Sequence, residues 1–218
     1  MLVARKPLQA KMRDGELSLR GLLRGFGLKV GEISKGQDAA RVRSLVVGHA
    51  MLEQIAEAML QAREALRTEF GKLHRTMLAI VRADEVCRRL MSVPGVGALV
   101  AVTFTSGVDA PERFARSRAV GAHFGLTPKK YPSGETDITG AVSRVGDVMV
   151  RTALYEAAHI LLTRAVRFST LKRWALEVAR RRGMRRAKGA LARKLAVILH
   201  RMWVEGTTFR WGREVGAA

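Results

Sequence analysis

The chain has 218 residues, 48% of them hydrophobic, which is enough for a sizeable core and excludes wholesale disorder. Lys and Arg outnumber Asp and Glu by 39 to 19, a surplus that attracts polyanions and predicts nucleic acid as the partner. There is neither an apolar run of about 18 residues to span a bilayer nor the apolar segment of a signal peptide, so we expect a cytoplasmic protein without a membrane partner.

The first third of the chain is expected to be helical. Residues 6–26 form a basic amphipathic pattern that ends in glycines, and residues 45–83 carry apolar residues at intervals of three, four or seven. The second pattern fits either a helix that packs on its own domain or a coiled coil that joins copies of the chain, and we favour the coiled coil and a homo-oligomer. The repeat consists of Leu45, Leu52, Ile55, Met59, Ala62, Leu66, Phe70, Leu73, Met77 and Ile80.

Residues 84–102 are predicted to form two helices joined by the turn Val93-Pro94-Gly95-Val96-Gly97. Glycines without a Cβ atom let backbone amides approach a phosphate at the start of the second helix, whose dipole favours the anion. A plain glycine turn between helices has the same sequence, so the turn alone leaves both interpretations open. Given the basic charge around it, we predict that Gly95, Val96 and Gly97 contact a nucleic-acid backbone, with Val96 also plugging the two helices together.

Residues 127–145 are expected to form a polar loop without regular secondary structure. In this loop Lys129 and Lys130 precede Ser133, and Gly134 follows it. The lysines could hold a scissile phosphate and the glycine leaves room for DNA, so Ser133 is the candidate nucleophile, although an ordinary turn has the same residue types. A serine hydroxyl needs a base or a metal ion to become nucleophilic, and because no histidine lies in the loop, its activation must come from elsewhere.

The expected fold is mostly α: a long coiled-coil-like helix followed by a helical domain that contains a helix-hairpin-helix-like DNA-binding motif. Further helices are expected at residues 117–124, 148–166, 171–181 and 187–203. The predicted divisions are residues 1–44 (an amino-terminal helix and linker), 45–83 (the coiled-coil helix) and 84–218 (a domain with a basic tail).

The basic tail is the expected electrostatic footprint. Between Arg164 and Arg201 stand thirteen Lys and Arg and one carboxylate, Glu177. Cations at this density repel one another unless phosphates neutralise them. Charge alone does not identify the class of protein, because a ribosomal or a membrane-surface protein could be equally basic. The cations that we expect to contact nucleic acid, besides the two lysines of the loop, are Arg144, Arg151, Arg181, Arg185 and Lys188.

The chain shows no pattern of metal ligands. Its single cysteine, Cys87, excludes a multi-cysteine zinc site, and we interpret it as a small helical filler. The five histidines are scattered singly, so we assign them no chemistry and assign the chain no metal site.

Several short segments follow one another in a set order: Cys87 to Gly97, Phe114, Ser117-Arg118, Phe124 to Pro128, Ser133-Gly134, Ser143 to Asp147, and Arg151. Together, in this order, they resemble the carboxy-terminal transposase domain of insertion-sequence family 110. The resemblance is specific over residues 84–165, extends to residue 210, and covers the amino-terminal helix and coil more loosely.

Complete members of that family are similar to RNA-guided recombinases, which join a RuvC-like domain with four acidic metal ligands, a coiled coil, and this domain with its serine. The resemblance implies that Ser133 attacks a DNA phosphodiester, that the RuvC-like domain holds Mg²⁺, and that a guide RNA pairs with donor and target DNA. It also implies that residues 95–97 and the arginine-rich tail hold DNA or RNA, and that the heptad helix mediates assembly.

Two features depart from the family pattern. Glu135 stands where the family has a second glycine, which places a negative charge near the expected phosphate. Residues 1–44 lack the strand-borne acidic array that binds catalytic metal ions, so we expect a chain without the RuvC-like domain that is inactive alone. The alternative is a truncated, non-catalytic nucleic-acid-binding helix-hairpin-helix protein. The carboxylates of that segment are Asp14, Glu16, Glu32 and Asp38.

Overall fold

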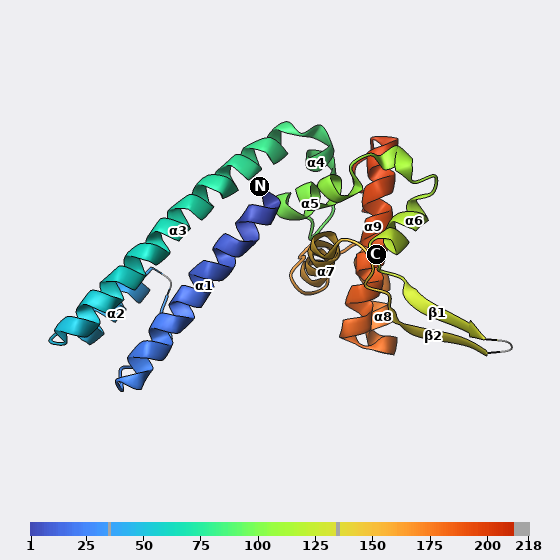
Figure 1. Ribbon diagram of the computed structural model, residues 1–218. Helices are drawn as coiled ribbons and strands as arrows, with labels where there is room; N and C mark the ends of the chain where they lie inside the picture. Colours follow the sequence, from blue (N-terminus) through green and yellow to red (C-terminus); the bar gives the residue numbers. More distant parts are fainter. Residues whose placement is uncertain (35, 134–135, 212–218) are drawn as a thin grey trace, which may run out of the picture. The chain divides into compact units, whose positions relative to one another are not determined.

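The computed structural model describes residues 1–34, 36–133 and 136–211, and the chain divides into two compact units, residues 1–79 and 80–218. The described secondary structure consists of nine α-helices, one short 3-10 helix and one two-stranded sheet (Figure 1). The prediction of a mostly α fold is therefore confirmed. The domain boundaries predicted after residues 44 and 83 stay predictions. The two compact units are divided between residues 79 and 80, in the last turn of the helix Ala50–Ala83.

Unit 1 is built from three helices, α1 (Leu2–Gly25), α2 (Asp38–Val46) and α3 (Ala50–Ala83). Helices α1 and α3 lie side by side (Figure 1). The guanidinium carbon of Arg5 lies 4.7 Å from the ring centre of Phe70, so the start of α1 meets the later part of α3 and the pair is antiparallel. The apolar core of the unit consists of Leu19, Leu23, Val30, Val42, Val46, Leu52, Ala56 and Leu60.

The long helix of the heptad pattern begins at Ala50, not at residue 45 as predicted. Gly48 takes a φ of +85°, a conformation that side chains disfavour, and its amide donates to the Glu53 carboxylate at 2.9 Å. Leu45 therefore belongs to α2, while Leu52 packs in the core of unit 1. Packing within the chain accounts for the start of the repeat, and a coiled coil between copies stays a prediction.

A buried carboxylate links the three helices of unit 1. Asp38 is 4% exposed and accepts hydrogen bonds from Arg20 of α1 at 2.7 Å and Arg63 of α3 at 2.6 Å. Burying a carboxylate is costly unless charged donors satisfy it, which these two guanidinium groups do. Of the acidic residues in the first 44, this one is thus committed to holding the helices together.

Unit 2 is organised around its last helix, α9 (Met184–Glu205), which contacts most of the other elements. Leu191, Leu195 and Leu199 of α9 are fully buried, and alanines between them let neighbouring helices approach closely. Helix α7 (Val148–Thr163) begins directly after Asp147, whose carboxylate caps it by accepting from the amides of Met149 and Val150. The other helices are α4 (Glu85–Leu90), α5 (Ala98–Val108), η1 (Pro111–Arg113), α6 (Ser117–His123) and α8 (Thr170–Arg182).

The expectation of an irregular loop over residues 127–145 was wrong, because most of this segment forms a β-hairpin. Strand β1 (Pro128–Ser133) pairs antiparallel with β2 (Thr136–Val142), with an irregularity between Pro128 and Lys130. Prolines cannot donate to a sheet, but a two-stranded ribbon has only edge strands and tolerates them. The β-branched residues of the second strand favour the extended conformation.

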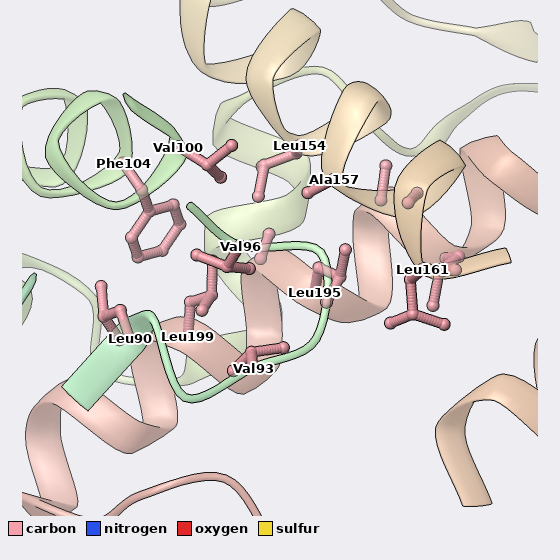
Figure 2. Packing of buried hydrophobic residues seen from close by; sticks show 14 of the residues in the cluster. Leu90, Val93, Val96, Val100, Phe104, Leu154, Ala157, Leu161, Leu195 and Leu199 are labelled. Atoms are coloured by element: carbon pink, nitrogen blue, oxygen red, sulfur yellow. The ribbon is translucent and has the colours of Figure 1, made fainter. Parts of the chain in front are cut away.

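The predicted turn between two helices is present, and its two valines are buried in the core (Figure 2). Val93 and Val96 point into the cluster that α5, α7 and α9 line, and Val96 is 5% exposed. Gly95 has a φ of +87°, and a Cβ atom there would overlap the carbonyl oxygen of Ala157 on α7. This glycine therefore serves close packing between the turn and α7.

We expect Gly95→Ala to lower the free energy of unfolding of unit 2 by about 2 kcal/mol or more, because the methyl group meets backbone atoms at a positive φ. Urea unfolding can be followed by tryptophan fluorescence, since all three tryptophans lie in unit 2. The matched control is Gly97→Ser, at a position with a φ of −96° and no atom within 4 Å of a Cβ, which should change stability by less than about 0.5 kcal/mol. Equal stability of the two variants would contradict the packing role of Gly95.

Candidate functional site

The hairpin that carries Ser133 is rooted where α6 ends and α7 begins. Gly125 follows α6 with a φ of +63°, and a Cβ atom there would overlap the backbone of Val145. Gly146 precedes α7 with a φ of +93°, and its Cβ atom would overlap the carbonyl oxygen of His123. The two chain segments at the base of the hairpin therefore cross at a distance that only glycines permit.

Backbone hydrogen bonds join the same two segments. The amide of Ser143 donates to the carbonyl of Thr127 at 2.9 Å, and the amide of Arg144 donates to the carbonyl of Gly125 at 3.1 Å. Arg144 itself takes a φ of +58°, an uncommon conformation for a residue with a side chain. We call residues 124–127 and 143–146 the hairpin foot.

Arg151, from the first turn of α7, holds the hairpin foot. Its Nη1 atom donates to the carbonyl oxygen of Phe124 at 3.1 Å and lies 3.4 and 3.5 Å from those of Val145 and Gly146. One nitrogen of the guanidinium group thus reaches carbonyl oxygens on both sides of the crossing. The predicted contact of Arg151 with nucleic acid stays a prediction, and the structure gives this side chain a positioning role.

Ser133 is the last residue of β1, and its Cα partner is Thr136. With a rise of about 3.3 Å per residue, β1 carries Ser133 about 17 Å from Pro128 at the base of the ribbon. Figure 1 shows the ribbon projecting from the helices of unit 2. Gly134 and the side chains of Lys130 and Ser133 lie outside the described residues.

Two of the predicted phosphate contacts at the hairpin are exposed. Lys129 lies on β1 near the base of the ribbon, and Arg144 lies in the hairpin foot. Val145 and Val148, which follow Arg144 in the chain, are also exposed. The base of the ribbon therefore presents Lys129 and Arg144 to solvent, and Arg144 shares a short stretch of chain with two exposed valines.

The three residues of the turn that are predicted to contact nucleic acid differ in their exposure to solvent. Gly97 is exposed and precedes the first turn of α5, where amides have no partner within the helix. Gly95 is half-buried against α7, and the Val96 side chain fills the core. Val96 thus joins the two helices as predicted, and its side chain is buried in the core rather than exposed to a ligand.

The arginine-rich tail forms a corner between α8 and α9, which we call the arginine corner. It contains Arg180, Arg181 and Arg182 at the end of α8 and Arg185 and Arg186 at the start of α9, all exposed. Cations are favourable at the carboxyl end of a helix but unfavourable at its amino end, and the first turn of α9 has no acidic residue. A polyanion would relieve this repulsion. Lys188 is half-buried instead, 6.0 Å from the ring centre of Tyr155.

Two buried groups that could have been reactive are committed to packing. Burial raises the pKa of the Cys87 thiol, which lies 3.6 Å from the Thr105 hydroxyl. His200 is buried with Nε2 2.9 Å from the Pro111 carbonyl and Nδ1 3.0 Å from the Ser117 hydroxyl. Because a carbonyl only accepts, Nε2 carries a proton, and His200 ties α9 to η1 and α6. Sequence periodicity gave no signal for this link.

Within the described residues, no group of three His, Cys, Asp or Glu side chains is placed to hold a metal ion. No described helix combines the length and apolar character needed to cross a membrane.

Comparisons with known proteins agree on one family. Residues 87–190 match the family described as Transposase IS116/IS110/IS902. The chain is 33% identical over 204 residues to the transposase for insertion sequence element IS1111A of Coxiella burnetii, covering 89% of this chain and 55% of that protein. It is 27% identical to a putative transposase of Sinorhizobium fredii, over 93% of this chain and 54% of that one, and 26% identical to a probable family 20 transposase of Pseudomonas aeruginosa, over 89% and 59%. The chain thus spans a little over half the length of these curated relatives.

We expect Gly97→Val to weaken binding of a DNA duplex, because the branched side chain would keep a phosphate away from the amides at the start of α5. The backbone at Gly97 is extended and its surroundings are open, so the variant should fold. Fluorescence anisotropy with a labelled duplex measures the affinity, and urea unfolding checks the fold. Unchanged affinity in the folded variant would show that the turn is structural only.

Proposed function

Because the chain belongs to the IS116/IS110/IS902 family of transposases, we propose that it binds DNA and supplies Ser133 as the nucleophile for strand cleavage and transfer. The observation that carries this proposal is the β-hairpin with Ser133 at the end of its first strand and a glycine-locked base. A covalent step requires its nucleophile to be held in a defined orientation, and a two-stranded ribbon tied to a helical core can provide that.

In the proposed step, the Ser133 hydroxyl oxygen forms a bond to the phosphorus of a DNA phosphodiester while the bond to one sugar oxygen breaks. The serine proton passes to a base, and the departing sugar oxygen gains a proton to become a hydroxyl. Attack by a strand hydroxyl on the resulting phosphoserine ester reverses the exchange and joins new ends. Lys129 and Arg144, both exposed at the base of the ribbon, are suited to hold phosphates of the bound strand.

The described residues do not fit a catalytic metal site. No suitable group of ligands is present among them, and Asp38 is already paired with two arginines. In this proposal the acidic groups that activate the serine, and any Mg²⁺ that they bind, come from a separate RuvC-like domain. We derive no step of this chain through the metal ion.

Nucleic-acid binding by this chain is proposed to use the arginine corner. Its five exposed arginines stand around one bend of the backbone, next to a helix end whose dipole opposes their charge. DNA and a guide RNA both offer the phosphates that would neutralise them. Assembly of two or more copies through α3 completes the proposal.

A second function is favoured by a specific observation: the described residues of this chain include the five exposed arginines of the arginine corner, but no group of three His, Cys, Asp or Glu side chains placed to hold a metal ion. The alternative is a non-catalytic nucleic-acid-binding protein. Binding without chemistry would then be its whole activity.

The decisive test mixes the chain with a separate RuvC-like domain from a relative, Mg²⁺, guide RNA and nicked substrate DNA. We expect a protein–DNA adduct that survives denaturing electrophoresis, and we expect Ser133→Ala to abolish it because the attacking oxygen is gone. The matched control is Ser106→Ala, which removes an exposed hydroxyl from α5 and should leave the adduct intact. An adduct that persists in Ser133→Ala contradicts the assignment, and nucleic-acid binding without any adduct favours the second function.

A further inference from the structure

The loop between α7 and α8, residues 164–169, presents two apolar side chains to solvent. Val166 is 98% exposed and Phe168 is 54% exposed. Single exposed apolar residues are ordinary on protein surfaces, but here two stand on one short loop of unit 2. Because neither is buried in the core of the unit, packing within the chain does not explain them.

The loop is held in place at several points, so its exposed residues are displayed in a fixed way. Its first amides donate to the carbonyl of Ile160, and Lys172 donates from Nζ to the carbonyl of Ala165 at 2.6 Å. At the other end, the buried Ser169 hydroxyl caps α8 by accepting from the amide of Lys172. Because the loop is anchored at both ends, it loses less conformational entropy when a ligand binds to Phe168.

The surroundings of the two apolar residues are cationic. Residues 164–173 contain four Lys and Arg and no carboxylate. The guanidinium carbon of Arg173 lies 6.0 Å from the ring centre of Phe168, and that of Arg167 lies 4.3 Å from the ring centre of Trp211. An apolar protein partner gains nothing from this charge, whereas a nucleic acid supplies both phosphates for the cations and bases for the aromatic ring.

We propose that Val166 and Phe168 form an apolar tip that stacks on, or inserts between, bases of a nucleic acid where they are unpaired or unstacked, while the neighbouring arginines contact flanking phosphates. Stacking uses the π-face that every base offers, so it favours exposed bases without selecting a sequence. Insertion of an apolar side chain at a base step is a known way for proteins to distort a duplex. The inference rests on the proposed nucleic-acid binding and does not depend on catalysis by Ser133.

The test measures binding of the full chain to a single-stranded oligonucleotide that carries the fluorescent base analogue 2-aminopurine, and to the matching duplex. We expect Phe168→Ala to weaken binding of the single strand about tenfold and to remove the change in 2-aminopurine fluorescence. The dependence of affinity on salt should stay the same, because no phosphate contact is lost. Phe168→Trp, which keeps an aromatic face, should retain both signals. DNA and RNA versions of the strand identify which nucleic acid the tip accepts.

The control is Leu176→Ala, which truncates another exposed apolar residue of unit 2, on α8, and should alter neither signal. If Phe168→Ala binds the single strand as tightly as the wild-type chain does, this inference is overturned and the proposed function stays in place. If Phe168→Ala instead abolishes self-association of the chain, the tip is a protein contact and the inference is wrong. Failure of the wild-type chain to bind any oligonucleotide would overturn the proposed function together with this inference.

Discussion

The close crossing of backbone at the hairpin foot is the constraint on which the candidate site depends. Gly125 and Gly146 let the end of α6 and the start of α7 pass at a distance that a Cβ atom would prevent. Arg151 then spans the crossing with hydrogen bonds to backbone carbonyls. Because α7 packs against α5 and α9, the base of the ribbon is joined to the core of unit 2.

The last two helices of unit 2 carry both buried core residues and exposed arginines. One face of α9 supplies buried leucines and alanines, while its first turn and the end of α8 carry the arginine corner. The buried face holds the helix in place against the repulsion among its own cations. Concentrated like charge of this kind lowers stability in the absence of a ligand and favours binding of phosphates.

The helices were predictable from the sequence because apolar spacing near 3.6 residues and polar caps are local signals. A helix was predicted over residues 148–166, for example, and α7 spans Val148–Thr163 with Asp147 as its cap. The β-hairpin was missed because the two prolines and two glycines of the segment were interpreted as loop residues and outweighed the β-branched residues of β2. The start of α3 was placed early because Leu45 fits the heptad spacing, although α2 ends at Val46 and Gly48 turns the chain with a positive φ.

The tertiary roles could not be predicted in the same way. Gly125 and Gly146 are 21 positions apart, and no periodicity connects them, so their crossing follows only from how α6 and α7 meet. Arg151 is predicted to contact nucleic acid from its place in a motif, and its second role, hydrogen bonding of Nη1 to carbonyls of the hairpin foot, follows only from the structure. Val96 was correctly assigned as a plug because a valine between two glycines has few other uses in a helix-joining turn.

The central claim is that the glycine crossing fixes the base of the serine-bearing ribbon. Hydrogen–deuterium exchange of the Ser143 and Arg144 amides tests it most directly, because these amides donate across the hairpin foot. The account predicts that both are protected in the wild-type chain and lose protection in Gly125→Ala, while the amides of α9 stay protected. Fast exchange of the two amides in the wild type, or unchanged protection in the variant, would contradict it.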